Sequence, residues 1–332
     1  MLEKPKLQED RIAYLLQRNY DLAVVSVEFL PLGHDPNSWV YKVRTDSTPY
    51  FLKLKKGKIY EPSVEVPWLL AEKGTREVLA PIKTNTEELW IEEEDSSLTL
   101  YPFVDGKTGR KAGMSDEQWR QFGSALKRIQ SIKLPDSQSK KVTSETFIPT
   151  STHLVMDLHS KVKDMRYEES LRKELALFWH ERHEEIGRII ERTEELGRQT
   201  KTSDLDFVLC HTDIHTDNIL LSDQGQLFII DWDDPLLAPK ERDLMFFVGK
   251  EKEQLFFDGY GKIEIDLTAI AYYCYALVVQ EIGDYGKQVF LSNEVEEKTR
   301  QAGVQEFIEL FDAGGVVESA YQADEKAGNQ KR

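Results

Sequence analysis

Alternating apolar and polar positions mark the N-terminal part of the chain. Residues 8–20 have helical apolar spacing, and three short runs rich in β-branched and aromatic residues follow, LAVVSVEFL, WVYKV and YFLKLK. Turn-forming residues separate these runs, PLGHDPN after the first and RTDSTP after the second. Runs of this kind between turn signals are typical of strands, so the pattern predicts an antiparallel meander.

Two further elements complete this part of the chain. Residues 63–74, SVEVPWLLAEKG, predict a helix that ends at Gly74. Residues 88–104, ELWIEEEDSSLTLYPFV, predict a second hairpin with an acidic turn. The N-terminal part therefore has the pattern of a small lobe that consists mainly of strands.

Helical spacing dominates after a Gly- and Lys-rich connector, DGKTGRKAGM. Ser115 and Gln118 have the spacing of a capping box at a helix start, and long helical stretches fill residues 151–199 and 265–313. The pattern predicts an α+β fold with two lobes. These are a small β-rich lobe, residues 1–103, and a larger, mainly helical lobe, residues 104–332.

One short β segment interrupts the helical region. After the run FVLC, the runs ILL (219–221) and LFII (227–230) flank the turn sequence SDQGQ and predict a hairpin. Asn218 comes just before its first strand, and Asp231 comes just after its second. Antiparallel pairing predicts that these two residues face each other, with Cα atoms about 4.5–5.5 Å apart.

Two oxygen-bearing side chains this close together suit a hard divalent ion such as Mg²⁺. Asp213 begins the loop before Asn218, and we expect it to accept a proton near that ion. The spacing D-x-x-x-x-N, followed by a hairpin and a second Asp, matches the catalytic loop of phosphoryl-transfer kinases. The pattern therefore predicts a centre for Mg²⁺ and ATP, with Asp213 as the catalytic residue and Asn218 and Asp231 as metal ligands.

Such a centre needs a cation on the α- and β-phosphates, which a lysine on a small-lobe strand supplies. Alternation in YFLKLK places Phe51, Lys53 and Lys55 on one face, and Lys53 is the candidate. The alternative is a solvated strand face. We expect an acidic partner for Lys53 from the following helix, where Glu61 and Glu65 share a face and both remain candidates.

The turn LGHDPNSWV is the candidate cover for the phosphates, with Asn37 and Ser38 as nucleotide-binding residues. It holds a single glycine, Gly33, and so matches a glycine-rich loop poorly.

Two histidines, His211 and His215, occupy the same loop. The spacing H-x-D-x-H also occurs in zinc sites of metallohydrolases, but a zinc site would leave Asn218 and Asp231 without a role. In a kinase centre we expect His211 to stabilise the loop, and His215 has no assigned role.

The segments HTDIHTDNILL and LFIIDWDDPLLAPKERDLMF resemble the aminoglycoside phosphotransferase family, whose motif runs H-G-D-x-H-x-x-N and then I-I-D-W. The resemblance is densest from Val208 to Phe246, and Thr212 replaces the usual glycine. It implies a bilobal protein-kinase-like fold and ATP as the phosphate donor. The site residues it implies are Asp213 as the base, Asn218 and Asp231 as metal ligands, Lys53 on the phosphates, and Tyr101 and Phe103 beside the adenine.

Charge and composition narrow the partners. The net charge of −16 and the pI near 5.0 argue against a nucleic-acid partner, which needs a basic face, and permit a cationic small molecule. Two cysteines make no disulfide framework, and the charged start MLEKPKLQED has no apolar signal sequence. The longest apolar run, AIAYYCYALVV, is too short to span a bilayer. We therefore expect a soluble, cytoplasmic protein without a membrane partner.

The expected function is ATP- and Mg²⁺-dependent transfer of phosphate to a hydroxyl of a small acceptor. The resemblance implies a cationic acceptor, spectinomycin or another aminoglycoside or aminocyclitol. Two alternatives stay open: a kinase for a metabolite such as choline, a sugar or an amino alcohol, and a nucleotide-binding module without catalysis.

Helical spacing in IDLTAIAYYCYALVVQEIGDYG places Tyr273, Glu281 and Asp284 on one face, which could bind ammonium groups by charge and cation–π contact. The alternative is that the tyrosines belong to the core and the acids to a solvated helix end.

Overall fold

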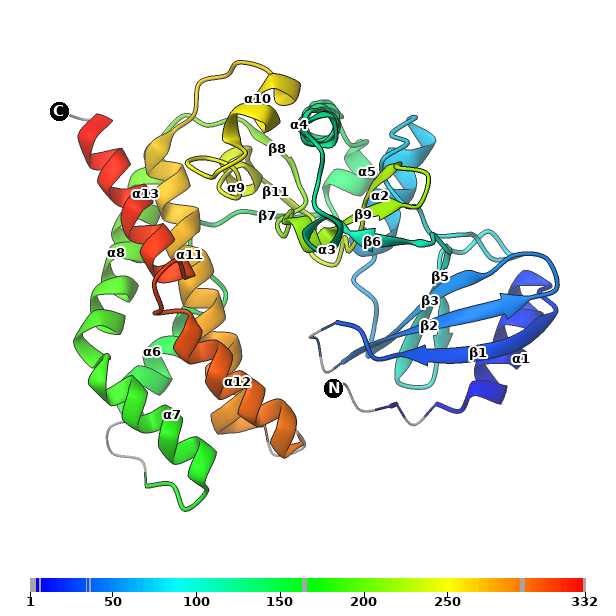
Figure 1. Cartoon of the computed structure of the whole chain (residues 1–332), viewed down its shortest axis with the longest axis horizontal. Coiled ribbons are helices and arrows are strands. Elements are labelled where there is room, and N and C mark those ends of the chain that lie inside the picture. Colours follow the sequence, from blue (N-terminus) through cyan, green and yellow to red (C-terminus); the bar gives the residue numbers. More distant parts are fainter. Residues whose placement is uncertain are drawn as a thin grey trace. The chain divides into compact units, whose positions relative to one another are not determined.

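The computed structural model (Figure 1) describes residues 4–5, 7–33, 35, 37–162, 166–292 and 296–330. Strands concentrate in the N-terminal part and helices in the C-terminal part, which confirms the predicted α+β class. The chain forms two compact units, each assembled from three stretches. Unit one comprises Met1–Thr143, Val208–Leu237 and Glu251–Lys262, and unit two comprises Ser144–Phe207, Ala238–Lys250 and Ile263–Arg332. The predicted boundary between residues 103 and 104 divides the chain by function, into a nucleotide-binding lobe and a catalytic and acceptor-binding lobe. This division stays a prediction.

A five-stranded antiparallel sheet with the strand order β1-β2-β3-β5-β4 forms the first part of unit one. Both the predicted meander and the predicted second hairpin are present. The strands are β1 (Val24–Leu30), β2 (Ser38–Thr45), β3 (Tyr50–Lys56), β4 (Ile91–Glu93) and β5 (Ser96–Pro102), and α1 (Glu9–Tyr20) packs on the sheet.

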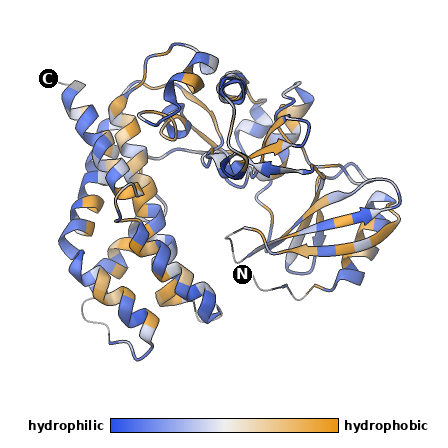
Figure 2. Cartoon of the chain, in the orientation of Figure 1, coloured by the Kyte–Doolittle hydropathy of each residue, from blue (hydrophilic) through white to orange (hydrophobic). Residues whose placement is uncertain are grey.

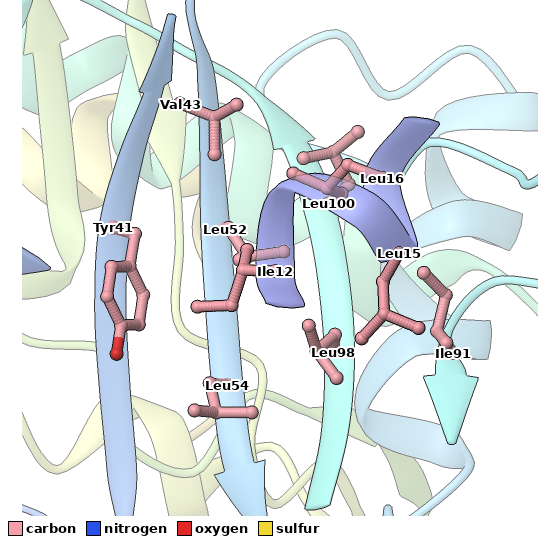
Figure 3. Close-up of a cluster of buried hydrophobic side chains, with 10 residues drawn as sticks. All are labelled: Ile12, Leu15, Leu16, Tyr41, Val43, Leu52, Leu54, Ile91, Leu98 and Leu100. Atoms are coloured by element: carbon pink, nitrogen blue, oxygen red, sulfur yellow. The ribbon is translucent and has the colours of Figure 1, made fainter. Parts of the chain in front are cut away.

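Alternation along β3 separates an apolar face from a charged face. Leu52 and Leu54 are fully buried and pack in a cluster with residues of α1, β2, β4 and β5 (Figure 3). The other members of the cluster are Ile12, Leu15, Leu16, Tyr41, Val43, Ile91, Leu98 and Leu100. Lys53 pairs with Val40 on β2 and Thr99 on β5, and therefore lies on the opposite face of the sheet.

A second, three-stranded sheet of unit one contains the predicted hairpin. β9 (Ile219–Ser222) and β10 (Leu227–Ile229) pair antiparallel, and β6 (Gly106–Thr108) adds to the free edge of β9. The segment that the sequence suggested as a connector is thus partly a strand. A Cβ on Gly106 would lie 2.1 Å from the carbonyl oxygen of Leu221, so only glycine permits this close pairing.

Two helices, one short and one long, contact this second sheet. α3 (Gly109–Ala112) follows β6, and α4 (Asp116–Ser131) begins with the predicted capping box of Ser115 and Gln118. Unit one also contains the helices α2 (Pro62–Glu72), α5 (Asp136–Ser139), η1 (Thr216–Asn218) and α10 (Glu253–Tyr260). Three further short strands are β7 (Thr143–Ser144), β8 (Phe207–Cys210) and β11 (Leu236–Pro239).

Unit two is helical and centres on α11 (Leu267–Gly286), whose ribbon is largely hydrophobic in Figure 2. Tyr272 and Tyr273 of α11 are almost fully buried, whereas Glu281 is partly exposed and Asp284 exposed. The tyrosines are therefore core residues, as in the second of the two interpretations of this helix. The other helices are α6 (Thr152–Lys161), α7 (Ser170–Glu181), α8 (His183–Thr202), α9 (Glu241–Leu244), η2 (Lys287–Leu291), α12 (Glu297–Glu309) and α13 (Val316–Gln330).

In the parts of the chain that the structure describes, no helix has both the length and the apolar character needed to cross a membrane.

Replacing Leu52 with Ala should lower the free energy of unfolding by about 2–5 kcal/mol, because the change leaves a cavity in the packed face of the sheet. Chemical denaturation monitored by fluorescence measures this loss. Leu177→Ala is the control, since Leu177 is 56% exposed and should change stability by no more than about 0.5 kcal/mol. Equal losses in the two variants would contradict the proposed core.

Candidate functional site

Lys53 lies between two carboxylates on the charged face of the large sheet. Its Nζ is 2.7 Å from Asp231 Oδ1 and 2.6 Å from Asp233 Oδ1. Lys55, on the same face of β3, contacts the other oxygen of Asp233 at 3.1 Å. Burial of Lys53 opposes its charged form, but the two carboxylates outweigh this effect and raise the pKa of the ammonium group above its ordinary value. The site therefore holds a permanent cation.

The same lysines determine the charge of Asp233. Burial favours the neutral acid, but Lys53 and Lys55 outweigh it and hold the pKa of Asp233 below its ordinary value. The next residue, Asp234, behaves in the opposite way, because burial and the charge of Asp233 raise its pKa. The pKa values of these adjacent carboxyl groups thus shift in opposite directions, because the lysines dominate at Asp233 and burial dominates at Asp234.

Asn218 fixes the position of Asp213. Its Nδ2 donates to the backbone oxygen and to Oδ2 of Asp213, both at 2.8 Å. Because both amide hydrogens point to Asp213, Oδ1 of Asn218 is the atom left for a cation. The Asp213 side chain is 57% exposed, so an acceptor molecule can reach its carboxylate.

His215 is a second partner of Asp213. Its Nε2 is 3.3 Å from Asp213 Oδ1, and its Nδ1 accepts the backbone N–H of Asp217 at 3.2 Å. Burial raises the pKa of Asp213, but the hydrogen bond and charge of His215 outweigh it and lower that pKa overall. Burial lowers the pKa of His215, and Asp213 outweighs it in turn, so the pKa of His215 is raised.

His211 stabilises the start of the loop, as expected. It is almost fully buried, its Nε2 bonds to the carbonyl of Ile230 at 2.9 Å, and its Nδ1 accepts the N–H of Asp213 at 3.3 Å. Its ring also contacts Trp232, with centroids 4.5 Å apart. Both ring nitrogens thus serve backbone groups, which does not fit a zinc ligand.

Two residues of the site have backbone angles that side-chain-bearing residues rarely adopt. Thr212, at the usual glycine position of the resembling motif, has φ 78°, and Asp231 has φ 65°. The Thr212 hydroxyl donates to the backbone oxygen of Asp234 at 3.0 Å, which stabilises the strained turn. The strain falls at the two points where the chain turns into the site.

The hairpin register differs by one residue from the predicted one. Ile229 pairs with Ile219, and the N–H of Ile230 donates to the oxygen of Asn218 at 3.0 Å. Asn218 thus lies opposite Ile230 rather than opposite Asp231. The positive φ of Asp231 ends the strand at this point, so strand pairing does not extend to its side chain.

Of the predicted adenine neighbours, Tyr101 lies near the end of β5 and Phe103 directly follows that strand. Tyr101 pairs with Phe51, its ring 6.4 Å away, and therefore shares the face of Lys53. Burial raises the pKa of Tyr101. Phe103 lies beneath the ammonium group of Lys42, which is 3.9 Å from the ring centroid.

Ser38 is buried opposite Lys55 at the start of β2. Asn37 is exposed, and its N–H donates to Asp35 Oδ1 at 2.9 Å. The predicted turn also includes His34 and Pro36, which lie outside the described residues.

The expected pairing of Lys53 with Glu61 or Glu65 is not found. Both glutamates contact Lys141 Nζ at 2.6 Å, whereas Lys53 contacts Asp231 and Asp233. A lysine from the segment after α5 takes the two acids, which a helix-and-strand pattern cannot reveal.

Sequence reasoning gave no role to Asp233, His215 or Asp217. The sequence contains a local signal for Asp233, because in IIDWD a single tryptophan separates this second acid from Asp231. Asp217 had none, since its partner Arg110 comes from the supposed connector and binds it at 2.9 Å.

Within the described ranges, no three His, Cys, Asp or Glu side chains are grouped so that they could hold a metal. A Mg²⁺ site of one carboxylate, one amide oxygen, water and phosphate needs no such group. Asn218 Oδ1 and the carboxylate of Asp231 have the oxygen chemistry that such a site requires.

Comparisons with known proteins identify the family and the fold. The model of the phosphotransferase enzyme family (APH) matches residues 27–261. The structure is similar to spectinomycin phosphotransferase APH(9)-Ia in complex with ADP and spectinomycin, with a TM-score of 0.87 and 30% identity over 96% of this chain and 99% of that chain. The expected kinase-like fold is thereby confirmed.

More distant relatives share less. Plasmodium vivax ethanolamine kinase has a TM-score of 0.61 and 16% identity over 93% of this chain and 89% of that chain, a likeness of fold. Protein StrN of Streptomyces griseus is 25% identical over 155 residues, which are 44% of this chain and 47% of StrN. This match spans less than half of StrN.

Asp233→Asn should remove a pH-dependent part of the stability. The lowered pKa of Asp233 stabilises the fold above the unfolded pKa of about 3.9, and this contribution is lost as the pH falls through the lower folded value. Wild type should therefore be more stable than the variant at pH 7, and the difference should shrink as the pH falls below the unfolded value of about 3.9. Urea denaturation between these pH values, with exposed Asp223→Asn as the control, measures the effect. A difference that does not change with pH would contradict the assigned ion pairs.

Proposed function

The chain belongs to the phosphotransferase enzyme family, and from this premise we propose that it transfers the γ-phosphoryl group of ATP to a hydroxyl of spectinomycin or a closely related aminocyclitol. The observation that supports this most is the grouping of Lys53, Asp213, Asn218 and Asp231 within one compact unit. A relative of known structure that resembles the chain over nearly its whole length holds ADP and spectinomycin.

Lys53 is the proposed phosphate-binding cation. In the structure its ammonium group is neutralised by Asp231 and Asp233. Phosphate oxygens of ATP would take over part of this role, so nucleotide binding exchanges carboxylate contacts for phosphate contacts. The side of the sheet that carries Lys53 also carries Tyr101, which we propose as an adenine neighbour together with Phe103. Asn37 and Ser38, at the start of β2, are the proposed cover for the phosphates.

Asp213 is the proposed base. As the acceptor oxygen forms its bond to the γ-phosphorus, the bond from that phosphorus to the β,γ-bridging oxygen breaks, and the hydroxyl proton passes to the Asp213 carboxylate. The lowered pKa of Asp213 keeps it ionised at neutral pH, ready to orient the hydroxyl. ADP leaves with the bridging oxygen.

Asn218 and Asp231 are the proposed Mg²⁺ ligands. When bound, Mg²⁺ would neutralise charge on the β- and γ-phosphates. Asn218 serves two purposes in this scheme. Its amide nitrogen donates both hydrogen bonds to Asp213, and its amide oxygen is the atom left to bind the ion. One side chain thus sets the base and the ion in a fixed relation.

The purified protein should phosphorylate spectinomycin in the presence of ATP and Mg²⁺, with one ADP formed for each phosphorylated product. Mass spectrometry of the acceptor and a coupled ADP assay measure this. The comparison panel is choline, ethanolamine, simple sugars and aminoglycosides. Faster turnover of choline or ethanolamine than of any aminocyclitol would replace the proposed acceptor and leave the phosphotransferase activity in place.

Asp213→Asn should lower turnover on the order of 10²–10⁴-fold while nucleotide binding stays nearly unchanged, because only proton transfer and hydroxyl orientation are lost. Steady-state kinetics and calorimetry with ADP separate the two effects. Asp223→Asn, a matched change in the exposed hairpin turn, should behave as wild type. A variant at position 213 with half of the wild-type turnover would contradict the assignment.

Asp231→Asn should weaken the dependence of nucleotide binding on Mg²⁺, since one anionic ligand is lost. ADP titrations with Mg²⁺ and with EDTA measure this dependence. Asp223→Asn is the control, because Asp223 is exposed in the hairpin turn and outside the proposed machinery. An undiminished Mg²⁺ effect in Asp231→Asn would rule out the proposed ligand.

A further inference from the structure

His215 lies one hydrogen bond away from the proposed base, and the proposed function gives it no role. The inference that follows rests on that function, since it concerns how Asp213 is held. The relevant contacts all belong to residues of unit one.

A series of contacts fixes the His215 ring. Arg110 Nη1 is 2.9 Å from Asp217 Oδ2, and the hydroxyl of Thr108 donates to Asp217 Oδ1 at 3.4 Å. The backbone N–H of Asp217 donates to His215 Nδ1 at 3.2 Å. A ring nitrogen that accepts a hydrogen bond carries no hydrogen, so the neutral ring has its hydrogen on Nε2.

That Nε2 faces the base. It lies 3.3 Å from Asp213 Oδ1, while Asn218 Nδ2 donates to Asp213 Oδ2 at 2.8 Å. Each carboxylate oxygen of Asp213 therefore has its own donor. Rotation of the carboxylate about its Cβ–Cγ bond would strain both hydrogen bonds together, so the two donors restrict its plane.

The support behind His215 comes from ordered elements. Thr108 ends β6, which pairs with β9, and Arg110 belongs to α3. Gly109 lets α3 approach the loop closely, because a Cβ there would lie 3.1 Å from the carbonyl oxygen of Thr216 and 2.9 Å from Met114 Sδ. A group held by packed elements positions its partner better than one held by a free loop.

We infer that His215 is a positioning residue for the phosphotransfer reaction: its Nε2–H holds the Asp213 carboxylate in the orientation that accepts the hydroxyl proton. Asp217, anchored by Thr108 and Arg110, selects the tautomer that makes this possible. The role is transmitted through Asp213, and His215 itself exchanges no proton with the acceptor.

Two substitutions separate positioning from a purely structural role. In His215→Gln, the side-chain amide nitrogen reaches the place of Nε2 and can donate to Asp213, but the acceptor for the Asp217 N–H is lost. In His215→Asn, the amide oxygen takes the place of Nδ1 and keeps that acceptor, but nothing reaches Asp213. The two variants thus each retain one of the two hydrogen bonds.

His215→Asn should lower kcat about 10–100-fold, the usual effect of losing a supporting hydrogen bond, with KM for ATP changed less than about threefold. His215→Gln should keep kcat within about threefold of wild type. The opposite order, with Asn active and Gln inactive, would show that His215 only shapes the loop and would overturn the inference. Equal activity of both variants and wild type would overturn it as well.

His153→Gln and His153→Asn are the matched controls, since His153 is exposed on α6 and outside the proposed machinery. A second readout needs no acceptor: ¹⁵N NMR of the histidine rings at about pH 9, well above the ordinary histidine pKa, should show His215 protonated on Nε2. Its signals are assigned by their absence in His215→Gln. A ring protonated on Nδ1 would overturn the inference.

The same variants are compared in ATP hydrolysis, with water as the acceptor, should spectinomycin prove to be the wrong substrate. The expected order is unchanged, because Asp213 orients the attacking oxygen in either case. A wild-type protein inactive in both reactions would overturn the proposed function and this inference together. An active wild type whose His215→Asn variant is equally active would overturn the inference alone.

Discussion

The ion pairs of Lys53 connect parts of unit one that are far apart in the sequence. Its ammonium group on β3 contacts Asp231, 178 residues later, and Asp233, 180 residues later. In a chain with a net charge of −16, two carboxylates this close would repel each other without such a cation. The position of the segment after β10 therefore depends on the strand that carries Lys53. A bound nucleotide has to compete with these carboxylates, which makes its affinity a difference between two sets of charged contacts.

Local patterns predicted much of this arrangement. The alternation in YFLKLK gave the correct face for Lys53, because side chains of a strand point to opposite faces by turns. The run of apolar residues on both sides of SDQGQ gave the hairpin, and the spacing from Asp213 to Asn218 gave the loop in which the two side chains are hydrogen-bonded. Each of these features is set within a few residues, so one sequence is sufficient to find it.

Features that depend on distant residues could not be found in the same way. Glu61 and Glu65 share a helix face, and the sequence therefore suggested either as the partner of Lys53. In the folded chain both contact Lys141, and Asp233 contacts Lys53 instead. The register near Asn218 depends on the φ angle of Asp231, which no apolar pattern encodes. None of the three residues of β6 has a hydrophobic side chain, so no periodic pattern in the sequence predicts its pairing with β9.

The close approach of β6 and β9 limits which sequences can replace this segment. At Gly106 the restriction is one of space, because any Cβ would overlap the carbonyl oxygen of Leu221. At Gly113 it is one of backbone angle, since φ is 72° and no atom lies within 4 Å of a Cβ there. With ψ at 129°, Gly113 also lies outside the left-handed helical region that asparagine tolerates, so both positions require glycine, one for space and one for backbone angle. A mutational library across the segment would recover only glycine at both positions, for two different physical reasons.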